Sequence, residues 1–394
     1  MAVPEIAAGA QTAAPLVTEA WDAKLLEESA LGEIFNQNQG IFNENTKQVP
    51  DSISVKVSGG KGETKRTFGM INRLDGDGLI SAAQDLRGNE EAQTTREMTV
   101  YGQEWYHGVP TEDYGLKKVE QDPYGIYKRA QPQLSTWAAE TRGRMQRQAL
   151  LEGWDGKQTD ATYGITALQG AVRYNPNFWV AGATSTVTYD STHADHVTNI
   201  VNDLASATDL DVAVLNEIEV LATEFELEPV TINGKQMFVL LIGSRQKKAL
   251  RTPAANSFFE TLKDADVRGA NNRALSGVLG AYGNLLICED PRMATFNNNA
   301  GTVSYGYKGP GSSDGRNIAG GTNYDVAMLL GKGAMVDYTI ENLHFETEIQ
   351  KYNRQMGIGA FATQGYTRRD YDNLTTPTNT TIRNQSSATI LLAK

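Results

Sequence analysis

Residues 122–154 read DPYGIYKRAQPQLSTWAAETRGRMQRQALLEGW, and this stretch decides the fold. Asp122 is a suitable N-cap, Pro123 suits the first turn of a helix, and Gly153 is a stop signal. Between them, mostly apolar residues recur at steps of three and four, which is the spacing of one stripe along a helix. The stripe consists of Ile126, Ala130, Leu134, Trp137, Thr141, Met145 and Ala149. At about 1.5 Å per residue the stretch predicts a long spine helix, which must lie along a sheet or another helix.

Pro132 and three arginines are the difficult residues of this helix. An interior proline removes a backbone hydrogen bond and kinks a helix. The sequence therefore allows either a bent helix or a short turn that leads into a helix starting near Gln131. Arg142, Arg144 and Arg147 lie mostly off the apolar stripe. We expect them either to form salt bridges to a neighbouring subunit or to solvate the outer face of the helix.

Composition limits the class of protein. The 394 residues are 40% hydrophobic, which is enough to bury a sizeable core, and the length suggests two or three domains or one discontinuous pair. A net charge of -11 argues against a protein that mainly grips nucleic-acid phosphates. Cys288 is the single cysteine and lies in an apolar run, so we expect a small core residue and no thiolate metal cluster. Residues 1–20 lack a signal-peptide pattern and no apolar run is long enough for a bilayer, so we expect a soluble protein of a reducing compartment.

The N-terminal third contains segments with little to bury. Residues 1–18 are rich in Ala, Gly and Pro and predict a flexible arm. Residues 19–42 are amphipathic and need a surface to lie on. Residues 53–109 begin with alternating apolar residues and read as a long two-stranded excursion. A two-stranded ribbon is marginal in water unless it packs on something, so we expect this one to pack on another chain.

Strands and helices alternate between about residues 195 and 335, which predicts an α/β domain with a central sheet. A helix is expected over 209–226, capped by Asp209, and a strand covered on both faces over 237–242. Residues 296–323 are rich in Asn and Gly and predict a long exposed loop. The remaining expected elements are a helix at 244–250, another at 253–262, a turn at 277–283 that feeds a strand at 285–288, and strands at 326–330, 334–338, 344–349 and 356–361.

No set of residues assembles a nucleophile, a base and an oxyanion site, so the sequence predicts no enzyme and no catalytic, cofactor-binding or metal site. His193 and His196, with Asp190 or Asp195, can share a metal if they lie on a helix, but a polar helix start is the preferred interpretation. Gly331-Lys332-Gly333 lacks the spacing of a phosphate loop and is interpreted as a turn. The carboxylate pairs Glu90-Glu91 and Glu112-Asp113 are expected to be solvated.

The order of these parts resembles the major capsid proteins of tailed bacteriophages, which have the Hong Kong 97 capsid fold. An arm precedes a projecting ribbon, a spine helix, an inserted α/β domain and a return to β-strands. Local sequence is similar to the subgroup typified by the phage N-four major capsid protein. The similar segments are 86–90, 277–283 and 327–331.

The resemblance implies an α+β fold and a division of the chain into regions. These are an N-terminal arm (1–52), an extended loop or β-ribbon (53–109), a peripheral domain with the spine helix (110–190), an axial domain (191–335), peripheral return strands (336–375) and a C-terminal tail (376–394). Loops of the axial domain would meet at the capsomer centre, with 296–323 as the candidate.

The resemblance also implies a function and partners. The chain would self-assemble into hexamers and pentamers of an icosahedral head shell that encloses the viral genome. Further partners would be scaffolding, portal and decoration proteins, with loose, non-specific contact to packaged double-stranded DNA and no membrane. Assembly would take place in the host cytoplasm, and the product would be the virion capsid. The alternatives are another virion structural protein, such as a decoration or tail component, and a metal-dependent enzyme that uses His193 and His196.

Overall fold

The computed structural model describes residues 53–60, 62–71, 95–110, 126–152, 175, 177–182, 187–189, 204, 207–232, 234–251, 278–299, 302–308, 320–350, 355–370, 372–373 and 386–393. None of the helices in these ranges is long and apolar enough to cross a membrane. The elements are β1 (Ser54–Ser58), β2 (Lys65–Ile71), β3 (Thr95–Tyr101), β4 (Gln103–Pro110), α3 (Ile126–Glu152), β5 (Phe178–Ala181), β6 (Val187–Tyr189), α5 (Val212–Glu224), β7 (Val230–Ile232), β8 (Lys235–Ile242), α6 (Ser244–Arg251), β9 (Val278–Tyr282), β10 (Leu285–Glu289), β11 (Thr295–Asn299), β12 (Thr302–Gly306), β13 (Thr322–Leu330), β14 (Met335–Gln350), β15 (Gln355–Arg368), β16 (Asp372–Asn373) and β17 (Ser387–Leu392).

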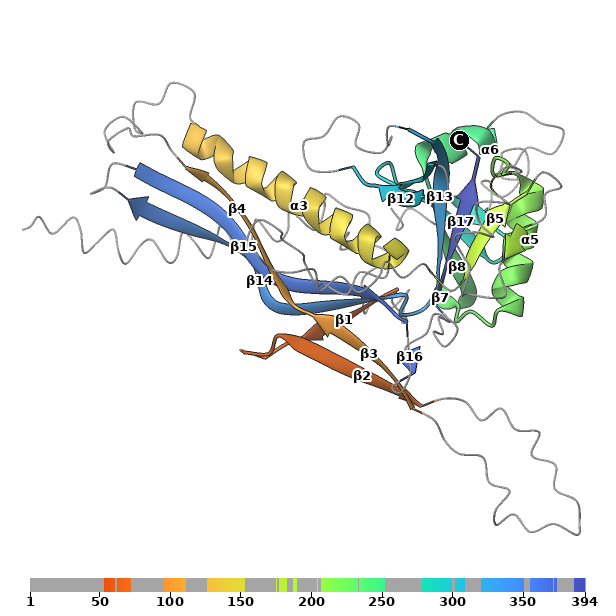
Figure 1. The fold of residues 1–394 in the computed structure, drawn as a ribbon, viewed down its shortest axis with the longest axis horizontal. Helices are drawn as coiled ribbons and strands as arrows, with labels where there is room; N and C mark the ends of the chain where they lie inside the picture. Colours follow the sequence, from red (N-terminus) through yellow and green to blue (C-terminus); the bar gives the residue numbers. More distant parts are fainter. Residues whose placement is uncertain are drawn as a thin grey trace, which may run out of the picture.

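Three sheets organise the described part of the chain (Figure 1). A four-stranded sheet has the order β1-β14-β15-β4, and the long helix α3 lies along it. A three-stranded sheet, β16-β3-β2, projects away from it as a ribbon. A ten-stranded mixed sheet follows the order β6-β5-β17-β13-β8-β10-β9, with β11, β12 and β7 attached, and forms the core of a separate α/β lobe. The predicted α+β class is confirmed.

The spine helix predicted over 122–154 runs continuously from Ile126 to Glu152 with Pro132 inside it. Of the two alternatives for this proline, the structure contains a helix that spans it, and no separate helix starts near Gln131. The predicted stripe is confirmed where side chains are described, because Ala130, Leu134 and Met145 are buried. This face packs on β15 and β4, where Trp137 meets Trp105 with ring centroids 5.6 Å apart.

The α/β lobe buries both faces of its sheet, because alternate side chains of each central strand enter two different cores. Phe238, Leu240 and Ile242 of β8 pack with Leu215 and Ile218 of α5. Val239 and Leu241 face the other core, which includes residues of α3 and β15 and therefore continues into the four-stranded sheet. The doubly covered strand predicted over 237–242 is confirmed. Cys288 lies in the second core, as predicted, and burial raises the pKa of its thiol to about 12.

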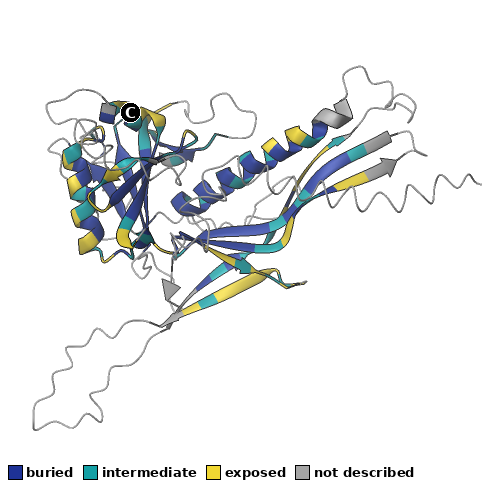
Figure 2. Ribbon diagram, turned by 180° about the vertical axis from the view of Figure 1, so that it is seen from behind, coloured by how far each residue is buried: buried dark blue, intermediate teal, exposed yellow. Residues whose placement is uncertain are grey.

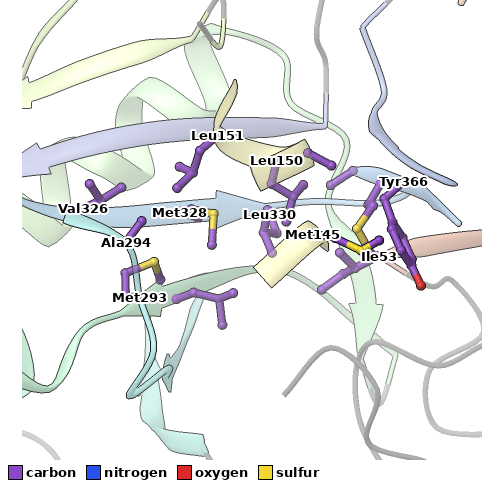
Figure 3. Close-up of a cluster of buried hydrophobic side chains, with 14 of the residues drawn as sticks. Ile53, Met145, Leu150, Leu151, Met293, Ala294, Val326, Met328, Leu330 and Tyr366 are labelled. Atoms are coloured by element: carbon purple, nitrogen blue, oxygen red, sulfur yellow. The ribbon is translucent and has the colours of Figure 1, made fainter. Parts of the chain in front are cut away.

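This second core joins the lobe to the spine helix (Figure 3). Met145, Leu150 and Leu151 come from the C-terminal half of α3. They lie beside Met328 and Leu330 of β13. Burial of side chains from both bodies in one core makes them a single packed unit.

Several sequence expectations for the lobe were wrong in detail. The N-cap of α5 is Asp211, whose carboxylate accepts a hydrogen bond from Val214 N at 2.7 Å, and the predicted cap Asp209 is exposed. Within the predicted turn 277–283, residues 278–282 form strand β9, antiparallel to β10, and Gly283 lies in the turn that follows it. The predicted loop 296–323 contains β11, β12 and the start of β13, and Phe296 is fully buried. A helix at 253–262 lies outside the described residues.

Two regional boundaries also differ from the expected map. The segment 376–394 was assigned to a tail, yet β17 pairs with β13 and β5 in the middle of the lobe's sheet. The strand β5 lies in the same sheet, although 110–190 was assigned to the peripheral domain. Both are short apolar strands that carry no local signal of the partner they pair with. The ribbon is also shorter than 53–109, because β1 and β4 belong to the four-stranded sheet.

Candidate assembly surface

The β2–β3 ribbon exposes most of the described residues of β2 (Figure 2). Lys65 of β2 is opposite Tyr101 of β3, and the two strands pair along seven residues of each. Residues 65–67 are exposed, whereas Met98 and Val100 are buried where the ribbon meets the rest of the subunit. A projecting sheet with so few buried side chains gains little stability of its own. Its free surface is therefore suited to a contact with another chain.

Glycines fix the point where the ribbon leaves the four-stranded sheet. A Cβ on Gly365 of β15 would lie 2.0 Å from the carbonyl oxygen of Tyr101, and one on Gly102 would lie 2.2 Å from Cδ1 of Ile340. These distances are far below van der Waals contact, so no larger residue fits without a shift. The backbone of Gly102 also donates a hydrogen bond to Thr64 O at 2.9 Å, which closes the base of the ribbon.

An aromatic row crosses the four-stranded sheet on the face opposite Trp105. Tyr106, Phe361 and His344 stand opposite one another on β4, β15 and β14. The rings of Tyr106 and Phe361 stack with centroids 5.7 Å apart, and those of Phe361 and His344 with centroids 6.1 Å apart. Tyr106 is 61% exposed, the highest value among the large hydrophobic side chains of the described residues. An exposed row of stacked rings is a typical feature of a contact surface.

Carboxylates surround the histidine of this row. His344 Nε2 lies 3.3 Å from Glu346 and 3.9 Å from Glu341. Partial burial lowers the pKa of His344, but the Asn342 carbonyl and the two carboxylates together outweigh it, so the pKa is raised overall. His344 therefore keeps its proton to a higher pH than an isolated histidine does.

Two of the three arginines singled out on the spine helix, Arg142 and Arg147, do not serve either of the expected roles. Arg147 is buried and donates two hydrogen bonds to Asp290, at 2.6 and 2.9 Å. Arg142 donates to Tyr366 Oη at 2.9 Å and to Asp337 at 3.2 Å. Burial lowers the pKa of Arg142, but Tyr366 and Asp337 raise it by more, so this guanidinium stays charged. Both side chains therefore stabilise the subunit from within.

Arg144 and Arg368 complete the set of buried cations around the helix. Arg144 is half-buried, burial lowers the pKa of its guanidinium, and its Nε has no hydrogen-bond partner. Arg368 of β15 donates to the carbonyl oxygens of Leu150 and Leu151 at 2.8 and 3.2 Å. It thus occupies the last, otherwise unsatisfied carbonyls of α3, and its charge favours the negative end of the helix dipole. Arg368 lies within the return strands expected over 336–375, and nothing in the sequence predicts this role.

The other motifs of the sequence form no chemical site in the described residues. Gly331-Lys332-Gly333 is the turn between β13 and β14, as predicted, and the N–H groups of Gly331 and Lys332 donate to Ser386 O and Glu228 O. Those groups are thereby unavailable to a phosphate. Among the described ranges, no group of three or more His, Cys, Asp or Glu is placed to hold a metal ion.

Six of the residues considered in the sequence for chemistry are not among those that the structure describes. His193 and His196 lie outside the described residues. The same is true of the pairs Glu90-Glu91 and Glu112-Asp113.

Comparison with known proteins shows which solved structures share this fold. No protein-family model matches the sequence, and a search of curated proteins finds no match. Solved structures do match. The capsid of Ralstonia phage GP4 has a TM-score of 0.59 and 16% identity, over 91% of this chain and 96% of the other. The Cyanophage Pam1 capsid has a TM-score of 0.58 and 15% identity, over 89% and 94%. The acid-stable capsid of Helicobacter pylori bacteriophage KHP30 has a TM-score of 0.52 and 14% identity, over 91% and 94%. The chain therefore has the Hong Kong 97-type capsid fold that its sequence predicted.

Proposed function

We propose that this chain is a major capsid protein, which self-assembles into the hexamers and pentamers of an icosahedral phage head shell. The observation that carries the proposal is the likeness to three phage capsids over 89–91% of the chain. The projecting ribbon and the exposed aromatic row support it, because both are surfaces that a lone subunit leaves unused. We infer a structural role and no enzymatic activity.

The proposed regional map follows the structure where the two differ. Residues 1–52 would be the arm, and β2 and β3 the loop that overlaps a neighbour. The peripheral domain would comprise α3 with the four-stranded sheet. The axial domain would comprise 191–335 together with β5 and β17. The finer assignment to the subgroup of the phage N-four capsid protein remains a prediction.

Partners follow from this function. Copies of the same chain would meet through heterologous contacts that close into rings of six and five. Many such modest contacts multiply into a stable shell. Scaffolding, portal and decoration proteins are the further partners that we propose, together with packaged double-stranded DNA. The net charge of -11 favours loose contact with that DNA. We propose the virion capsid as the location, with assembly in the host cytoplasm.

Sedimentation of the purified full chain, followed by negative-stain microscopy of the fast fraction, tests this function. We expect closed shells or flat sheets of hexamers, with the chain alone or with a candidate scaffolding protein. A matched variant in which an Asn-Gly turn replaces residues 65–101 should sediment only as free subunits. This replacement is feasible because Thr64 O and Gly102 N are already hydrogen-bonded across the ribbon's base. A wild-type chain that stays monomeric under both conditions would contradict the proposal.

A further inference from the structure

Two ion pairs join the spine helix to a single turn of the α/β lobe. The turn follows β10 and contains Asp290 and Arg292. Arg147 of α3 pairs with Asp290, and Glu140 of α3 pairs with Arg292. Residues 140 and 147 are seven positions apart, so they lie on the same face of the helix about 10 Å apart along its axis. We call these four residues the clamp.

The turn cannot move independently of the lobe's sheet. The backbone N–H of Asp290 donates to Ile242 O at the end of β8, at 2.9 Å. The N–H of Met293 donates to Asp290 O at 3.2 Å, and the N–H of Arg292 donates to the Asp290 carboxylate at 2.9 Å. Each ion pair between this turn and α3 therefore ties the helix to the central sheet.

The two ion pairs of the clamp have opposite orientations of charge. The helix supplies an acid at one point and a base at the other, and the turn supplies the opposite charges. A shift of the helix by two turns would bring Arg147 towards Arg292, so like charges disfavour that position. The apolar core beneath is less selective, because hydrophobic burial is non-directional and Met145 and Met293 are flexible side chains. Directional contacts at two separate points define an angle more narrowly than one contact or an apolar core alone.

We propose that the clamp sets the angle between the spine helix and the axial sheet, and that this angle sets the curvature at which subunits assemble. The second part rests on the proposed capsid function. The first part concerns the subunit alone. Glu140 and Arg292 are positioning residues in this scheme, because they act on the relative placement of two bodies and not on a neighbouring chain.

The outer pair provides the test. Side chains of Arg292 and Glu140 are 23% and 17% exposed, so variants at these positions should fold even where variants of the fully buried Arg147–Asp290 pair do not. The variants are E140K, R292E and the charge swap E140K/R292E, all in the full chain. The matched control is K247Q, because Lys247 pairs with Glu289, next to Asp290, and this pair joins two elements of the lobe without involving α3.

Two measurements separate the subunit from the shell. Amide hydrogen exchange before assembly should be faster in E140K and R292E than in wild type, in the turn 290–293 and the C-terminal half of α3. In both single variants, microscopy of assembled particles should show a range of particle diameters instead of one uniform diameter. The charge swap should lie closer to wild type than either single variant in both measurements, and K247Q should match wild type.

The outcomes that overturn the proposal are equally distinct. Wild-type exchange in both single variants, or a charge swap no better than the worse single variant, would contradict the clamp. Faster exchange with unchanged particle diameter would contradict its link to curvature. If the wild-type chain forms no shells, the capsid function fails, whereas the exchange data still decide whether the clamp fixes the angle.

Discussion

The buried pair of Arg147 and Asp290 makes a quantitative prediction. The two side chains are 2% and 1% exposed, so water cannot replace either partner. In Arg147→Met the Asp290 carboxylate loses hydrogen bonds of 2.6 and 2.9 Å and keeps the one from Arg292 N. Removal of one partner of a buried pair costs about 3–5 kcal/mol. A domain is typically stable by about 5–15 kcal/mol, so this loss is large.

Equilibrium unfolding of the free subunit in urea, followed by circular dichroism, measures this loss. The control is Arg369→Met, because the pair of Arg369 and Glu228 has a similar separation of 3.0 Å but is 25% and 41% exposed. Exposed pairs contribute only about 0–1 kcal/mol. The double variant Arg147→Met with Asp290→Asn should recover part of the loss, because no uncompensated buried charge remains. Equal destabilisation by Arg147→Met and Arg369→Met would refute the assignment of the buried pair as a major stabilising contact.

Three further predictions concern the ribbon, the glycine of β15 that lies against its base, and the aromatic row. Replacing residues 65–101 by Asn-Gly should leave the α/β lobe folded by circular dichroism but abolish fast-sedimenting particles; normal shells would exclude the ribbon from assembly. Gly365→Ala should lower stability by about 1–3 kcal/mol in thermal unfolding, since its Cβ would lie 2.0 Å from Tyr101 O; Gly357→Ala, with no atom within 4 Å, is the control and should not. The raised pKa of His344 means that its ion pairs stabilise the fold below the unfolded pKa of about 6.5 and that this contribution is lost as pH rises through the folded value. Wild type minus His344→Gln should therefore show a larger melting-temperature difference at pH 5.5 than at pH 8, and a difference independent of pH would contradict this.

Local periodicity explains which parts of the fold were predictable. The stripe of α3 and the apolar runs of β8, β10 and β13 each lie within one segment of the sequence. Each of these elements forms where its pattern predicts it. Composition misled at 296–323, where Asn and Gly predict a loop. Asn297 is instead buried and donates to Gly320 O at 2.9 Å and Asn323 Oδ1 at 3.1 Å. Satisfied hydrogen bonds make a buried asparagine stable, and the sequence carries no local sign of them.

Long-range pairing explains what could not be predicted. Arg147 and Asp290 are 143 residues apart, and neither carries a signal of the other. The apolar run of β17 predicts a strand in any fold, but its place between β13 and β5 depends on tertiary pairing. The aromatic row has the same origin, because Tyr106, Phe361 and His344 meet only through the registers of three strands. A candidate contact surface of this kind becomes visible only once the sheet is assembled.

The stiffness of the junction determines where a shell subunit of this kind can adapt. A ring of five and a ring of six require different angles between neighbours. Within the described residues, the spine helix and the α/β lobe share one core and two ion pairs, so a change of their relative angle would expose apolar surface and separate buried charges. The ribbon buries Met98 and Val100 and pairs with β16 but leaves residues 65–67 exposed, so moving it disturbs fewer buried side chains than changing the angle of the spine helix. Under the proposed function, we therefore expect the ribbon to take up the difference between pentamer and hexamer, while the body of the subunit keeps the curvature that the clamp sets.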